Sequence, residues 1–404
     1  MTARILIECG AAETRAAFVD DGVVTHLWFG PARGDEMLAT ETAASDIVAG
    51  RVTSVSKSLS AVFVDIGAAR EGFLPIRKGE KPPIEGARAL FSVHRPPIGE
   101  KGAVLSSDWR KGLSEADVAL LEKKAATGAV GMIGETLDAA ASAFHSIRAM
   151  SKGAVADVIV NDPTSKRLLE AAGAGGVLLE RQSFAENDVD GVIEESLASI
   201  VALPGGARLI FQETAAGAVI DVDTASAGEG GGARLNDKVN VAAAARILLD
   251  LSRRSLGGRV IIDFLPPTNA QARSALVETM KTGLKRFDGA RFGRIAPDGL
   301  CDFTLPRRRR SLLEEASEPV GADWPVAGRR FTLDWSAKAA IRALESALGA
   351  RPSSQFRLAA AADIVRYLER ERPQWRNRLA QKYGARFDII ENETLKSGTY
   401  DLAE

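Results

Sequence analysis

The stretch from Ala216 to Pro267 constrains the fold of this 404-residue chain more than any other. Two short apolar runs within it, Ala218–Ile220 and Val260–Ile262, each end in a carboxylate, Asp221 and Asp263. A glycine-rich loop and a long alanine-rich helical pattern lie between them. This order of strand, helix and strand predicts two parallel strands joined by a right-handed crossover. Both carboxylates should then lie at the same edge of the sheet, where open α/β folds bind their ligands.

Asp221 and Asp263 together predict a site for a hard divalent cation. Two acidic groups with no basic partner beside them in the sequence favour an ion such as Mg²⁺, which binds oxygen ligands. The same pattern also fits a plainer role, in which each aspartate caps the turn after its strand. The glycine run Gly228–Gly232 is not followed by the lysine and serine or threonine of a phosphate-binding P-loop. It is therefore expected to be a flexible loop near the site.

Composition restricts the classes of function. The net charge of −1 excludes a global basic field, so any nucleic-acid site must be a local patch of lysines and arginines. The 3 histidines are spread along the chain, which argues against a histidine-based nuclease or a serine triad. Cys9 and Cys301 are too few for a zinc ribbon and indicate a reducing compartment. Since neither a signal peptide nor a membrane-spanning apolar run is found, the expected location is the cytoplasm.

Residues 46–75 predict a small β-barrel. Two strand-like runs, Ile47–Val55 and Ala61–Ile66, are separated by a short polar turn, and short strands at this spacing are typical of an OB-type barrel. Phe63 and Phe73 are the aromatic residues of this segment. Rings on such a barrel can stack on the bases of a single strand, although a phenylalanine on a strand is also a common core residue.

The opening ETRAAFVDDG and the segment AGRVTSVSKSLSAVFVDIGAAREGFLP carry the motifs of one protein family. They resemble the N-terminal hairpin and the S1 RNA-binding domain, respectively, of the bacterial ribonuclease E/G family of endoribonucleases. ADVIVNDPTSKRLLEA resembles the returning part of its RNase H-like domain. The most specific likeness is to the catalytic, DNase I-like subdomain, which is matched by VIDVDTASAGEGGG, NVAAAA, RSLGGRVIIDFLPP and GRIAPDGLCDFTLPRRRRSL.

The resemblance implies a multidomain fold of the α/β and α+β classes. Its parts would be an RNase H-like domain with an inserted S1 (OB-type) β-barrel, a DNase I-like catalytic subdomain and a small α-rich C-terminal domain. The implied ranges are 1–43 and 151–206 for the RNase H-like domain, 44–112 for the S1-like domain, 113–150 for a reduced 5′-sensor-like region, 207–312 for the catalytic subdomain and 313–404 for the small C-terminal domain.

The resemblance also implies roles for single residues. Asp221 and Asp263 fall on the two catalytic, metal-binding aspartates of the family, and Asp223 falls where the family usually has an asparagine that supports the metal. The implied chemistry is hydrolysis of a phosphodiester by water that Mg²⁺ activates, which leaves a 5′-phosphate. The residues implied to contact RNA are Phe63, Phe73, Asn240, Arg307 and Arg308. For the basic run that holds the last two, a solvated turn is the alternative.

Three departures from the family pattern change what is expected of this chain. Asp223 adds negative charge beside the ion, which would tighten cation binding or alter the pKa values of its neighbours. Ser107–Met150 is shorter than the family's 5′-sensor, and Glu135 stands where an arginine would be required, so 5′-monophosphate sensing is not expected. No cysteine pair follows Arg310. Structural zinc and a zinc-linked dimer are therefore not expected, which leaves other oligomers open.

The leading hypothesis is a Mg²⁺-dependent endoribonuclease that cleaves single-stranded RNA, such as mRNA or rRNA precursors. The alternative is a catalytically weak or inactive RNA-binding protein that keeps the same fold. A DNA-directed phosphodiesterase has only the DNase I-like fold in its favour, and fold alone does not determine the substrate. Metal-dependent cleavage of RNA distinguishes the first hypothesis from the second.

Overall fold

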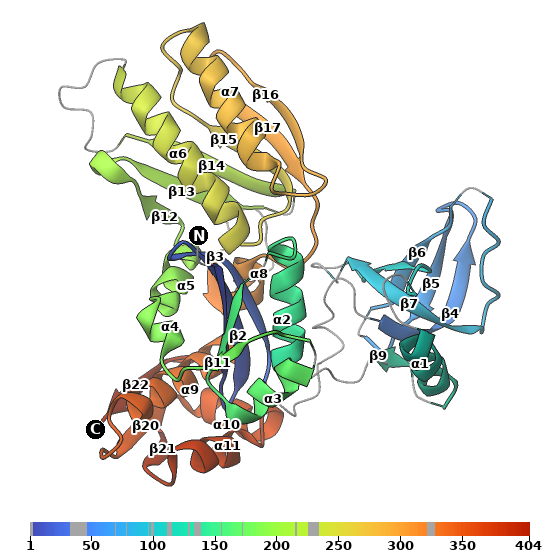
Figure 1. Ribbon diagram of the computed structural model, residues 1–404, viewed down its shortest axis with the longest axis vertical. Coiled ribbons are helices and arrows are strands. Elements are labelled where there is room, and N and C mark those ends of the chain that lie inside the picture. The colour runs from blue at the N-terminus through green and yellow to red at the C-terminus, as the bar shows by residue number, and fades with distance from the viewer. Residues whose placement is uncertain are drawn as a thin grey trace. The chain divides into compact units, whose positions relative to one another are not determined.

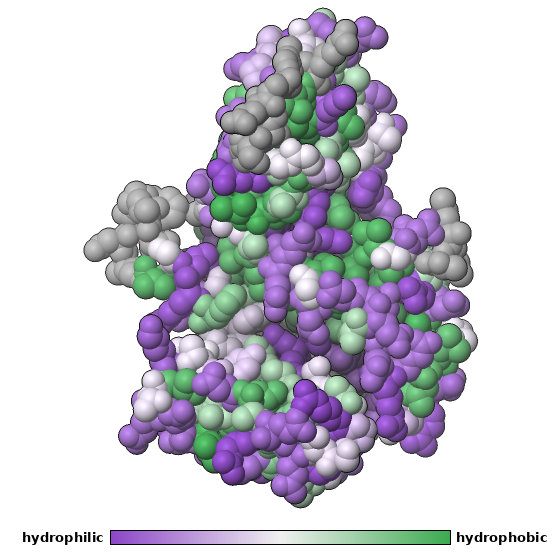
Figure 2. All heavy atoms as spheres, turned by 90° about the vertical axis from the view of Figure 1, so that its left-hand side faces the viewer, coloured by the Kyte–Doolittle hydropathy of each residue, from purple (hydrophilic) through white to green (hydrophobic). Residues whose placement is uncertain are grey.

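The computed structural model describes residues 3–32, 47–68, 70–77, 79–95, 97, 101–110, 115–127, 130–132, 139–154, 156–171, 173–214, 216–224, 234–320 and 328–404. Their helices and sheets make a mixed α/β, multidomain chain (Figure 1). Two compact units can be separated: Met1–Glu36, Leu137–Asp190 and Leu313–Glu404 form one, and Met37–Thr136 with Gly191–Leu312 form the other. In the view of Figure 2, hydrophobic residues lie in patches among hydrophilic ones. No helix within the described ranges is long and apolar enough to cross a membrane.

The first unit contains a five-stranded sheet in the order β11-β10-β1-β2-β3. Its strands are β1 (Ala3–Cys9), β2 (Glu13–Asp20), β3 (Val23–Pro31), β10 (Asp157–Val160) and β11 (Val177–Leu179). A tight turn joins β2 to β3, in which Asp21 and Gly22 adopt positive φ values of 46° and 80°. Helices α2 (Ala139–Met150) and α3 (Pro163–Ala171) pack against this sheet through a shared apolar core.

The C-terminal part of the first unit combines helices with a three-stranded sheet in the order β21-β20-β22. Its elements are α8 (Leu312–Ala316), β18 (Ser317–Pro319), β19 (Arg329–Phe331), α9 (Leu333–Ala350), β20 (Phe356–Ala360), α10 (Ala362–Glu371), α11 (Trp375–Tyr383), β21 (Phe387–Glu391) and β22 (Tyr400–Ala403). The small residues Ala11 and Ala12, between β1 and β2, are buried in the core of this part. The N-terminal hairpin and the C-terminal helices therefore share a core.

The predicted barrel is confirmed as a closed β-barrel of five strands. These are β4 (Ile47–Ser56), β5 (Ala61–Asp65), β6 (Gly72–Pro75), β7 (Arg88–Arg95) and β8 (Val104–Ser106). The order β5-β6-β8-β7-β4 closes on itself because β4 also pairs with β5. Valines such as Val48, Val62 and Val64 fill its interior. Two further elements join this barrel: β9 (Gly131–Met132) pairs with β4, and α1 (Glu115–Thr127) contributes the buried Leu121.

The second unit also contains a six-stranded sheet in the order β12-β13-β14-β15-β17-β16. Its strands are β12 (Ile200–Ala202), β13 (Arg208–Glu213), β14 (Gly217–Asp223), β15 (Gly258–Asp263), β16 (Arg291–Ile295) and β17 (Leu300–Leu305). Helices α6 (Arg234–Arg253) and α7 (Ala270–Leu284) belong to the same unit, whereas α4 (Ser183–Glu186) belongs to the first unit and α5 (Val189–Leu197) spans the division of the chain after Asp190. Apolar residues at helical spacing predict a helix over residues 188–200 that includes Ile200. This end of the predicted helix is wrong, since α5 ends at Leu197 and Ile200 begins β12, where it pairs with Ile210.

The parallel pair predicted around the carboxylates is present. Strands β14 and β15 are parallel neighbours and α6 connects them. Helices α6 and α7 lie side by side over one face of the sheet, which supplies Ile220, Val222 and Ile262 to the core (Figure 1). Side chains alternate between the two faces of a strand. Asp221 and Asp263 therefore belong to the opposite face, which the two helices leave uncovered.

Candidate metal centre

Asp221 and Asp263 are direct neighbours across β14 and β15. Asp221 is in register with Asp263, and neighbouring strands lie about 4.8 Å apart. The Asp221 side chain is partly buried and that of Asp263 is exposed. This is the juxtaposition that the order of strands predicts, whereas metal binding by the two carboxylates stays a prediction.

The electrostatics of Asp221 reflect a local excess of negative charge. Partial burial raises the pKa of Asp221 above its usual range, and the charges of Asp263 and Asp223 raise it further, while Arg208 opposes them. Asp221 therefore lies between two carboxylates that both act on it, Asp263 across the strand pair and Asp223 on its own strand. A cation placed among them would relieve this repulsion.

Asp223 lies two residues beyond Asp221 on the same face, and it is paired with an arginine. Arg208 is directly opposite Asp223 in the register of β13 and β14. Its Nε and Nη2 atoms donate to Oδ2 of Asp223 at 2.8 Å and 2.6 Å. Arg208 was not predicted from the sequence. The signal was there, however, because the short turn between β13 and β14 sets a register that places residue 208 opposite residue 223.

The donor set fits a magnesium ion that has few protein ligands. Within the described ranges, no three carboxylate, imidazole or thiol side chains come close enough to form a ready-made metal cage. Mg²⁺ does not require one, since it commonly binds one or two carboxylates and completes its shell with water and substrate phosphate. Asp221 and Asp263 offer such a pair of oxygen donors on an accessible face.

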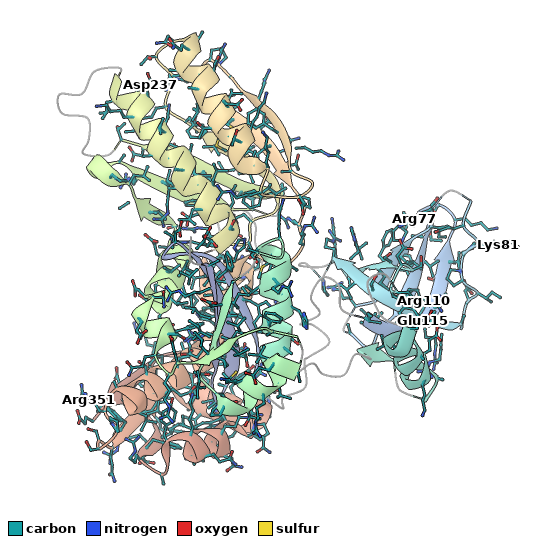
Figure 3. The ribbon with its side chains drawn as sticks, viewed as in Figure 1. Arg77, Lys81, Arg110, Glu115, Asp237 and Arg351 are labelled. Atoms are coloured by element: carbon teal, nitrogen blue, oxygen red, sulfur yellow. The ribbon has the colours of Figure 1, made fainter. Side chains whose placement is uncertain are left out.

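The loop that follows Asp263 is held by the first turns of α6. Asn240 is buried, and its side-chain amide both donates to the carbonyl oxygen of Leu265 at 2.8 Å and accepts from the Leu265 N–H at 3.1 Å. Asp237, labelled near the start of α6 in Figure 3, accepts hydrogen bonds from the backbone and hydroxyl of Thr268. The structure thus gives Asn240 a positioning contact beside the carboxylate pair, and its contact with RNA stays a prediction.

Gly299 also supports this loop, because there is no room for a side chain at its position. It has a φ of +103°, and a Cβ there would lie 2.0 Å from the carbonyl oxygen of Phe264. Gly299→Ala should therefore destabilise the protein by more than about 3 kcal/mol, since backbone must move to admit the methyl group. Gly205 has a φ of +84° but open space around it, so Gly205→Ala should cost only about 1 kcal/mol. Urea unfolding of both variants tests this, and equal midpoints would contradict it.

Arg307 and Arg308 lie away from the carboxylate pair along the sheet. Arg307 Nε donates to the carbonyl oxygen of Gly257 at 3.2 Å, just before β15 begins, whereas Asp263 ends that strand. At about 3.3 Å per residue, the length of β15 separates them by roughly 17 Å. Arg308 donates to the carbonyl oxygen of Asp288 at 3.2 Å. The two arginines are therefore not brought together with the aspartates, and their contact with RNA stays a prediction.

Phe63 and Phe73 form a pair on the outer surface of the barrel. They are in register across β5 and β6, and their ring centroids lie 5.9 Å apart at an interplanar angle of 76°. Both are only partly buried, and neither belongs to the barrel core. On the neighbouring strands, Phe73 is opposite Val104 and Val104 is opposite Arg95. Arg95 is a cation that was not predicted from the sequence. The arrangement favours the base-stacking interpretation over the core interpretation.

Other charged residues of the barrel are engaged with each other. Arg77 donates to Asp108 at 2.9 Å, and Arg110 pairs with Glu122 and lies over the ring of Trp109. Arg77 and Arg110 are labelled in Figure 3. Two features named above lie outside the described residues, namely Glu135 and the glycine run Gly228–Gly232.

Comparison with known proteins supports the family suggested by the motifs. Residues 118–308 match the model of the ribonuclease E/G family. Ribonuclease G of Salmonella typhimurium (strain SL1344) is 24% identical over 410 residues, which cover 77% of this chain and 81% of that protein. Ribonuclease E of Escherichia coli (strain K12) is 24% identical over 367 residues, which cover 67% of this chain. The chain is therefore similar to the ribonuclease E/G family over residues 118–308, and to individual ribonucleases of that name over most of its length.

The residues that match the family model include the whole of the carboxylate-bearing sheet, β12 to β17. Asp221, Asp223 and Asp263 therefore lie within the match. The barrel strands β4 to β8 precede the matched residues. The aligned part of this chain covers 81% of the Salmonella ribonuclease G but only 34% of the Escherichia coli ribonuclease E.

Proposed function

We propose that this protein is a Mg²⁺-dependent endoribonuclease that cleaves single-stranded RNA, with mRNA or rRNA precursors as substrates. The observation that carries the proposal is the in-register pairing of Asp221 and Asp263 on the uncovered face of a sheet that matches the ribonuclease E/G family. The relatives named ribonuclease G and ribonuclease E support the same reaction class.

Each part of the chain would have a separate task in this reaction. Asp221 and Asp263 would hold the ion, and Asn240 would fix the backbone beyond Asp263 so that its carboxylate keeps its place. Bound Mg²⁺ would lower the pKa of water and offset the charge that grows on the phosphate, which leaves a 5′-phosphate on the downstream product. Phe63 and Phe73 would stack on bases, which gives affinity with little dependence on sequence.

The fold supports a matching assignment of domains. We assign the β1–β3, β10 and β11 sheet to the RNase H-like domain and the barrel to the inserted S1 domain, because the barrel strands lie between β3 and β10 in the chain. The sheet from β12 to β17 would be the DNase I-like catalytic subdomain. The C-terminal elements from α9 onward would be the small domain.

A cleavage assay tests the proposal. Purified protein is incubated with an unstructured RNA labelled at its 3′ end, with Mg²⁺ or with EDTA. Internal cleavage in Mg²⁺ only, with products that carry a 5′-phosphate, is the expected result. Cleavage that persists in EDTA would contradict the proposed mechanism. Tight, salt-dependent RNA binding without metal-dependent products would favour the alternative of an RNA-binding protein that has lost turnover.

A further inference from the structure

The third carboxylate of the centre raises a problem of charge. Asp221, Asp223 and Asp263 lie on one face of the sheet: Asp221 is opposite Asp263 in the register of β14 and β15, and Asp223 is two residues beyond Asp221 on β14. If all three faced a divalent ion unopposed, the loaded centre would keep a net negative charge. It would then repel the phosphate group of an approaching RNA.

Arg208 supplies the missing positive charge at a fixed position. Its guanidinium contacts Oδ2 of Asp223 through two nitrogen atoms, and the strand register places the two residues directly opposite each other. The side chains of Arg208 and Asp223 are 43% and 31% exposed, so the pair lies at the surface of the centre.

We propose that Arg208 is a positioning residue that keeps Asp223 from acting as a metal ligand and cancels its charge. The ion is then held by Asp221 and Asp263, and the three carboxylates are balanced by one guanidinium and one divalent cation. Groups that hydrogen-bond around a metal site commonly set its affinity in this way. The inference rests on the proposed function, because it assumes that the Asp221 and Asp263 pair binds the ion.

The test measures Mn²⁺ binding without RNA, from the EPR signal of free Mn²⁺, and RNA cleavage in parallel. Arg208→Gln should tighten Mn²⁺ binding by about tenfold, since an additional carboxylate then acts on the ion, and it should slow cleavage. Adding Asp223→Asn to Arg208→Gln should return both quantities to within about twofold of the wild type, because charge is again balanced. An exposed ion pair contributes only about 0–1 kcal/mol to stability, so all variants should fold.

Arg259→Gln is the matched control. Arg259 is an exposed arginine of β15 that pairs with Asp302 at 3.3 Å, so its loss should leave Mn²⁺ affinity unchanged. Unchanged or weaker Mn²⁺ binding in Arg208→Gln would overturn the inference. A cleavage defect that Asp223→Asn does not rescue would also overturn it, and would show instead that Arg208 contacts RNA. If the single variant Asp263→Asn binds Mn²⁺ as tightly as the wild type does, the proposed metal site is wrong and the inference is wrong with it.

Discussion

Replacing Asp263 by asparagine is expected to slow cleavage of unstructured RNA by about a thousandfold in Mg²⁺, because a bound metal contributes several kcal/mol to the stabilisation of transition-state charge. Asp263 is exposed at the end of β15 and is nearly isosteric with asparagine, so the fold should be unaffected. The rate is measured under single-turnover conditions, which separate the chemical step from product release.

Asp302→Asn provides the control for this loss of charge. Asp302 lies on the neighbouring strand β17, opposite Ile261 of β15 rather than opposite Asp263, and it pairs with Arg259. Its substitution should change the cleavage rate by no more than about threefold, since it removes only an exposed ion pair. Equal losses in Asp263→Asn and Asp302→Asn would mean that general electrostatics, and not a metal site at Asp263, determine the rate.

The double variant Phe63→Ala with Phe73→Ala is expected to weaken the binding of single-stranded RNA by about a hundredfold, since each stacked base contributes roughly 1–3 kcal/mol. The rings lie in register on the outside of the barrel and do not belong to its core, so the barrel should remain folded. Binding is measured by fluorescence anisotropy in EDTA, which prevents the proposed metal-dependent cleavage.

Phe331→Ala tests whether any exposed ring would have the same effect. Phe331 is 55% exposed on β19, far from the barrel in sequence. Its removal should leave RNA affinity within about twofold of the wild type. If the barrel variant binds RNA as tightly as the wild type, the stacking surface must lie elsewhere on the chain.

The sequence predicts the centre of this site well because the relevant signals are local. Apolar runs that end in Asp221 and Asp263, with one helical pattern between them, permit few topologies other than a parallel pair, and the two residues are in register. The first two barrel strands, β4 and β5, were also predictable, since two strand-like runs separated by a short polar turn mark them. Both predictions depend on patterns within about 50 residues of chain.

What the sequence did not reveal depends on pairing between strands or between distant segments. The pairing of Arg208 with Asp223 follows only from the strand register, which places the two residues opposite each other. Strands β20 and β22 are short, and they form because they pair with each other although about 40 residues separate them. Arg307 was considered from its charge alone, yet its Nε contacts the backbone of Gly257 at the far end of β15.

The position of a bound divalent ion tests the account most directly. Crystals soaked in Mn²⁺ would reveal the ion by its anomalous scattering. We predict a peak between the carboxylates of Asp221 and Asp263, with Asp223 still bonded to Arg208 and outside the coordination shell. The absence of a peak at this pair, or strong binding only elsewhere in the chain, would contradict the assignment of this sheet face as the catalytic centre.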